Sequence, residues 1–142
     1  MTRENENRNT CKHIAEELEK YVNGEIYNCP ECGEHCTVEE EENENGDIIY
    51  KCSCGCVSEY EPDQLSVWDW AEDILNIEYR MTSRRELRSV QIMVACGGPN
   101  IYVDTATKSV ELYWWGDRAS YPISYDAAAE LDAWAEEMWG CM

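Results

Sequence analysis

Six of the nine cysteines of this 142-residue chain fall between positions 29 and 56, and their spacing constrains the fold more than any other feature. Cys29 and Cys32 are separated by two residues, and Gly33 follows them. The two-residue spacer lets both thiolates reach one metal ion, and the glycine permits a tight turn whose backbone N–H groups face the sulfur atoms. This pattern is typical of a zinc knuckle.

A second, less regular knuckle follows twenty residues after Cys32. Cys54 and Gly55 repeat the end of the first knuckle, although a single residue separates Cys52 from Cys54. Two knuckles joined by a hairpin resemble a zinc ribbon, here over residues 26–60. We therefore predict one structural zinc ion per chain. Its predicted ligands are Cys29, Cys32, Cys52 and Cys54.

The second half of this predicted site allows other ligands. Cys56 can replace either Cys52 or Cys54. Cys36 and His35 are further alternatives, because they lie close to the knuckles in the sequence. A redox dithiol is the weaker interpretation, since a Cys-x-x-Cys redox pair normally begins a helix in an α/β domain. Four thiolates leave no open coordination position for a substrate or an activated water, so we expect the zinc to be structural.

The remaining sequence predicts an α+β fold in three parts. Residues 1–9 are polar and are expected to form a disordered lead. Residues 10–62 are expected to form a helix capped by Thr10, followed by a zinc-ribbon-like hairpin module with its turn at residues 43–46. Residues 63–142 are expected to form an α-β-β-β-β-α domain, in which helices cover an antiparallel β-meander.

The elements of the third part follow from their apolar periods and turn residues. The helix that opens it has apolar positions at a helical spacing, and the strands alternate. Ser124 is a favourable N-cap for the final helix, whose apolar stripe includes Leu131 and Trp134. The predicted elements are a helix over residues 62–75, strands over residues 77–81, 90–95, 101–103 and 110–115, and a helix from residue 125 onward.

The charge indicates a class of partner. Thirty acidic and eleven basic residues give a net charge of −19, and both halves of the chain are acidic. Such a chain is not expected to bind nucleic acid directly, because that binding depends on Lys and Arg neutralising phosphates. It is expected to be steered toward a basic protein surface. The candidate partner-binding residues are Glu39, Glu40, Glu41, Glu42, Glu130, Asp132, Glu136 and Glu137.

Catalysis and membrane insertion are not expected. His13 and His35 are the only histidines, and they form no recognisable catalytic set with a serine or an acidic residue. No stretch approaches the ~20 apolar residues of a membrane span, and the polar first ten residues do not form a signal peptide. We therefore expect a cytoplasmic protein, and in a reducing compartment a cysteine cluster favours metal binding over disulfides.

The chain resembles the zinc-bearing anti-CRISPR proteins, which inhibit type II-A RNA-guided nucleases. The resemblance rests on the Cys29/Cys32 and Cys52/Cys54 pairs. It also rests on residues 97–104 (GGPNIYVD) and 113–115 (YWW), which precede an acidic final helix. It implies a protein of a phage or mobile element that acts in the bacterial cytoplasm, and it transfers no site residues.

The function implied by this resemblance is binding to the nuclease so that target DNA cannot load. These nucleases hold the guide–target heteroduplex in a positively charged channel, for which an acidic protein can compete. A different class of function is a zinc-ribbon adaptor in a transcription or replication complex that binds a basic protein partner. A metal-dependent hydrolase is a third and weaker interpretation.

Overall fold

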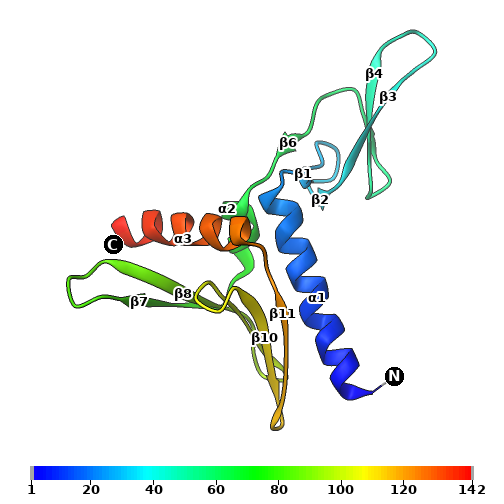
Figure 1. Cartoon of the computed structure of the whole chain (residues 1–142). Coiled ribbons are helices and arrows are strands. Elements are labelled where there is room, and N and C mark those ends of the chain that lie inside the picture. Colours follow the sequence, from blue (N-terminus) through cyan, green and yellow to red (C-terminus); the bar gives the residue numbers. More distant parts are fainter. Residues whose placement is uncertain (1, 142) are drawn as a thin grey trace.

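The computed structural model describes residues 2–141 and has the predicted α+β class. A long helix α1 (Arg3–Val22) and a C-terminal helix α3 (Tyr125–Gly140) pack with a five-stranded antiparallel sheet, and short strands carry the cysteines (Figure 1). The remaining elements are β1 (Tyr27–Asn28), β2 (His35–Cys36), β3 (Val38–Glu42), β4 (Ile48–Cys52), β5 (Val57–Ser58), β6 (Asp63–Gln64), α2 (Val67–Trp70), the 3₁₀ helix η1 (Ala71–Asp73), β7 (Asn76–Met81), β8 (Leu87–Ala95), β9 (Asn100–Asp104), β10 (Ser109–Trp114) and β11 (Asp117–Pro122).

Helix α1 begins eight residues earlier than the sequence predicted. The Thr2 hydroxyl accepts a hydrogen bond from the backbone N–H of Asn5 at 3.3 Å, so Thr2 rather than Thr10 is the N-cap. Thr10 lies inside the helix and donates its hydroxyl to the carbonyl of Glu6 at 3.0 Å. The prediction of a disordered lead over residues 1–9 is therefore wrong for residues 3–9, and Met1 lies outside the described residues.

The five-stranded sheet is a meander in the order β11-β10-β9-β8-β7, with every neighbouring pair antiparallel. The four predicted strands are confirmed, but the fifth strand, β11, was missed. Trp115 and Gly116 both have positive φ, of 51° and 83°, and they connect Trp114 to Asp117 across a two-residue hairpin turn. Both central residues of a type I′ turn have positive φ, so Gly116 continues the sheet instead of ending it.

The helix predicted over residues 62–75 is confirmed only over residues 67–73, where α2 continues into η1, and it is wrong at both ends. Asp63 and Gln64 form the short strand β6, which pairs with β1. The helix α2 starts only after Ser66, whose backbone N–H donates to the carboxylate of Asp69 at 2.8 Å. The Ser66 hydroxyl in turn accepts the N–H of Trp68 at 3.3 Å. This capping box fixes the helix start, although the apolar spacing alone permits an earlier one.

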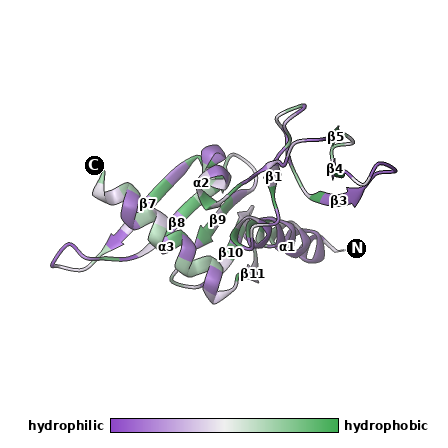
Figure 2. Ribbon diagram, turned by 90° about the horizontal axis from the view of Figure 1, so that it is seen from above, coloured by the Kyte–Doolittle hydropathy of each residue, from purple (hydrophilic) through white to green (hydrophobic). Residues whose placement is uncertain are grey.

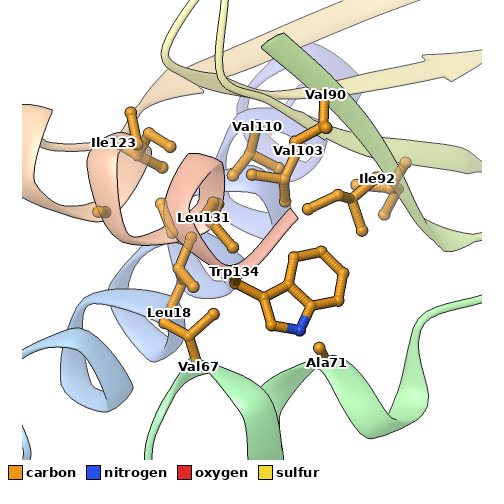
Figure 3. Packing of buried hydrophobic residues seen from close by; sticks show 14 of the residues in the cluster. Leu18, Val67, Ala71, Val90, Ile92, Val103, Val110, Ile123, Leu131 and Trp134 are labelled. Atoms are coloured by element: carbon orange, nitrogen blue, oxygen red, sulfur yellow. The ribbon is translucent and has the colours of Figure 1, made fainter. Parts of the chain in front are cut away.

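The main core lies between the sheet and all three α-helices. Leu18 of α1, Val67 of α2 and Trp134 of α3 point at the same apolar face of the sheet (Figure 3). That face is built by side chains of β8, β9 and β10 that alternate along each strand, among them Ile92 and Val103, both fully buried. Helix α1 therefore shares its core with the sheet, and a division after residue 62 does not separate two cores.

The cysteine-rich segment lies at the end of α1, away from the main core (Figure 1). It comprises two small antiparallel sheets, β2-β1-β6 and β3-β4-β5. The predicted hairpin is confirmed, because β3 pairs with β4 and the Asn43 side chain accepts the N–H groups of Asn45 and Asp47 at 3.0 and 2.9 Å. This hairpin projects from the molecule, and β3 is hydrophilic from Glu39 onward, after the apolar Val38 at its start (Figure 2). We refer to residues 27–64 as the cysteine module.

Candidate metal centre

The first knuckle closes as the spacing predicts. The N–H of Gly33 donates to the carbonyl of Cys29 at 2.8 Å, and the N–H of Cys29 donates to the carbonyl of Glu34 at 2.9 Å. Gly33 adopts a φ of 77°, a conformation in which a side chain is strained. The turn starts at the end of β1 and brings the side chains of Cys29 and Cys32 to the same side.

The second knuckle is the same turn with one residue fewer. The N–H of Gly55 donates to the carbonyl of Cys52 at 2.9 Å, and the N–H of Cys52 donates to the carbonyl of Cys56, also at 2.9 Å. Gly55 has a φ of 97°. Cys52 thus occupies in this turn the position that Cys29 occupies in the first, and Cys54 occupies the position of Cys32.

One group of four thiols has the dimensions of a metal site. The sulfur atoms of Cys29, Cys32, Cys54 and Cys56 all lie within 4.8 Å of one another. The Cys32 and Cys54 sulfur atoms are 3.6 Å apart. Two thiolates on one tetrahedral zinc ion, with Zn–S bonds of about 2.3 Å, lie about 3.8 Å apart. The four cysteines can therefore hold a metal ion, and we call them the primary group.

A second group overlaps the first. The sulfur atoms of Cys36, Cys52 and Cys54 also lie within 4.8 Å of one another, and Cys54 belongs to both groups. Three of the four predicted ligands are thus in the primary group, where Cys56 takes the fourth place. Cys52, the remaining predicted ligand, lies in the second group together with the alternative ligand Cys36. Spacing alone did not distinguish Cys52 from Cys56, because the two flank Cys54 symmetrically in the sequence.

The backbone of the first knuckle favours the thiolate form of Cys29, which is the form that binds a metal. The N–H groups of Cys32 and Glu31 hydrogen-bond the Cys29 sulfur and lower the pKa of that thiol to about 6. In the second group, burial raises the pKa of the Cys52 thiol, and the neighbouring Cys36 and Cys29 sulfur atoms raise it further. Thiols that crowd one another in this way resist ionisation until a cation neutralises them, as a bound metal does.

His35 lies beside the cysteine groups but has another partner. Its Nδ1 atom is 2.7 Å from the hydroxyl of Tyr21, in the last turn of α1, and the two rings meet edge to face. Gln64 makes a second link to the end of α1, because its side-chain amide donates to the carbonyl of Gly24 at 2.8 Å. These contacts fix the cysteine module to the helix that enters the main core.

The predicted partner-binding acids form two separate sets. Glu39, Glu40, Glu41 and Glu42 are exposed on the projecting strand β3, where Glu41 pairs with Lys51 at 2.8 Å. Glu130, Glu136 and Glu137 are exposed on α3, on another side of the molecule (Figures 1 and 2). Asp132 is half-buried, and its Oδ1 atom is covered without a hydrogen-bond partner in the described structure. The eight residues therefore do not form one surface.

No protein family, no curated protein and no solved structure matches this chain. Within residues 2–141, none of the helices combines the length and the apolar composition that crossing a membrane requires.

Proposed function

We propose that this chain is a binding protein whose fold is stabilised by zinc and whose acidic surface engages a basic partner. The observation that carries the metal assignment is the primary group of four thiols within 4.8 Å of one another. Thiolate ligands in a tetrahedral set are the preferred environment of zinc in proteins. The ion that these residues bind is structural, because four protein thiolates complete its coordination.

The small apolar content of the cysteine module supports a structural role for the metal. Its buried hydrophobic cluster consists of Cys29, Cys36 and Cys52, with Val38 and two further cysteines packed against it. Such a core is too small to offset the conformational entropy of the 38 residues of the module. The free energy of metal binding supplies the difference in modules of this kind.

The proposed partner is a type II-A RNA-guided DNA nuclease, and the proposed effect is to block loading of target DNA. The net charge of −19 and the exposed glutamates of the hairpin and of α3 support binding to the positively charged channel of such an enzyme. The resemblance to zinc-bearing anti-CRISPR proteins supports the choice of partner. The proposed role is that of an inhibitor that binds and does not catalyse a reaction.

A zinc-ribbon adaptor in a transcription or replication complex is the second candidate. The observation that favours it is the hairpin β3–β4, which extends beyond the two knuckle turns as ribbon hairpins do (Figure 1). In this role the acidic hairpin would contact a basic protein partner of the host.

The deciding experiment measures target-DNA binding by the guide-loaded nuclease with and without this protein. We expect DNA binding to fall as the protein is added before the DNA, and to be unaffected by an unrelated acidic protein of equal charge. Normal DNA loading with blocked cleavage would overturn the proposed mechanism. Normal loading and normal cleavage would overturn the nuclease as partner and leave the adaptor as the candidate to test.

A further inference from the structure

Two buried cysteines have no place in a site of four thiolates. Cys36 and Cys52 are 3% and 6% exposed, and their sulfur atoms lie within 4.8 Å of each other and of Cys54. If the primary group alone bound a metal, these two thiols would serve only as apolar side chains. Their positions in the fold point to a different role.

The turn geometry marks Cys52 as a ligand position. Its N–H and carbonyl make the same closing hydrogen bonds that those of Cys29 make in the first knuckle. Cys54, two residues later, is within ligating distance of both groups of thiols. A thiolate has enough lone pairs to bind two cations at once, so Cys54 can bridge two ions.

The two groups share one sulfur. Cys54 belongs to both, whereas Cys29 belongs to the primary group alone. With Cys54 shared, the six thiols supply four sulfur ligands to one ion and three to another.

We propose that the cysteine module binds two zinc ions in one binuclear cluster. Cys29, Cys32 and Cys56 bind the first ion alone, Cys36 and Cys52 bind the second ion alone, and Cys54 bridges the two. A water molecule fills the fourth position of the second ion. The inference rests on the zinc assignment made above and changes its stoichiometry from one ion to two. Each thiol that becomes a ligand releases its proton to solvent.

The charge of the cluster is no larger than that of a single-ion site. Six thiolates and two Zn²⁺ ions carry a net charge of −2, and four thiolates with one Zn²⁺ ion carry the same charge. Binding the second ion thus adds three metal–sulfur bonds, to Cys36, Cys52 and Cys54, without adding to the net charge that the module holds.

The test is the zinc content of the full-length protein after equilibration with excess zinc and removal of loosely bound metal. We expect two zinc ions per chain by native mass spectrometry and elemental analysis, and a zinc–zinc path in the X-ray absorption spectrum. One ion per chain would overturn the binuclear cluster and leave the structural zinc in place. A protein without zinc would overturn both proposals.

Single substitutions locate the second ion. Cys36→Ser and Cys52→Ser are each expected to reduce the content from two ions to one, and Cys54→Ser is expected to weaken the binding of both. Cys96→Ser is the matched control, because Cys96 is exposed and lies in neither group. Two ions retained in both the Cys36 and Cys52 variants would place the second ion elsewhere and overturn the proposal.

Discussion

Arg80 holds Asp104 by two parallel hydrogen bonds, of 2.9 and 2.8 Å, that reach across β8 from β7 to β9. Ser89, on the strand between them, accepts a third hydrogen bond from the same guanidinium at 3.5 Å. The Asp104 carboxylate is almost fully buried and also accepts the N–H of Ala106 at 2.9 Å. The pair thus joins three strands of the sheet. The sequence has four arginines between residues 80 and 88, and nothing in their spacing indicated that Arg80 would pair with Asp104.

Asp104→Asn is expected to lower the free energy of unfolding by about 2 kcal/mol at neutral pH, because a charged hydrogen bond is lost. Burial raises the pKa of Asp104, but the hydrogen bonds from Arg80 and Ala106 outweigh it, so the pKa is lowered. The stabilisation is therefore fully present above the unfolded-state pKa of about 3.9 and is lost as the pH falls through the lower folded-state value.

Denaturant titrations of both proteins across this acidic range test the expectation, and the difference between them should shrink below about pH 4. Asp117→Asn is the control, because Asp117 forms an exposed ion pair with Arg3 at 3.3 Å, which is worth about 0–1 kcal/mol. Equal effects of the two substitutions at neutral pH would show that burial of the Asp104 pair contributes nothing.

Leu18→Ala is expected to destabilise the main core and leave the metal site unchanged. Leu18 is fully buried between α1 and the sheet, and removing such a side chain costs about 2–5 kcal/mol. Leu75→Ala, at a position that is 59% exposed, is the control. Thermal unfolding and zinc content are measured for both variants. Loss of zinc in Leu18→Ala under conditions where the sheet stays folded would contradict the separation of the two cores.

Zinc chelation is expected to unfold the cysteine module and to leave the sheet with α1 and α3 folded. The two buried clusters share no residue, so the main core does not depend on the metal. Amide hydrogen exchange should rise in residues 27–64 and stay slow in β8, β9 and β10. Restored protection after zinc is added back is the control for irreversible damage. Uniform exchange along the whole chain would mean that the metal stabilises both parts.

The hairpin glutamates are expected to contribute more to nuclease binding than those of α3. Strand β3 projects into solvent, where a partner can surround it (Figure 1). Each single charge should contribute only about 0–1 kcal/mol. The triple variant E39Q/E40Q/E42Q should therefore weaken inhibition roughly tenfold, equivalent to about 1.4 kcal/mol.

E130Q/E136Q/E137Q is the matched control for this prediction, because it removes the same charge from a different surface. Glu41 is left unchanged in the hairpin variant, since its pairing with Lys51 makes it part of the hairpin structure. Inhibition titrations at two salt concentrations separate charge from shape, because added salt shortens the Debye length from its value of about 8 Å. A larger loss in the α3 variant would assign binding to that helix.

The sequence was most informative where local chemistry decides the structure. The N-cap Ser124 accepts the N–H of Ala127 at 3.0 Å, as its side chain favours, and the hairpin turn at residues 43–46 forms as its Asn-Gly pair predicts. The alternating apolar residues of β8, β9 and β10 also gave the right strands, because one face of the sheet is buried.

The predictions failed where tertiary packing decides. The first turns of α1 are polar, and the residue that they bury is Asn7. The sequence therefore shows no helical spacing of apolar residues there. Strand β11 alternates between half-buried and exposed residues, which gives a weak apolar pattern. Among the cysteines, Cys52 and Cys56 differ only in the direction that β4 and the following turn give their side chains, and sequence spacing contains no such information.

The packing of α1 against the end of the chain has a consequence for folding during synthesis. Helix α1 contacts β10 and β11, more than eighty residues away, whereas the cysteine module closes when β6 pairs with β1. Contacts between near neighbours in the chain form early, and distant ones must wait for the rest of the chain. We expect the nascent chain to bind zinc first. Helix α1 can pack against the sheet only after β10 and β11 have been synthesised.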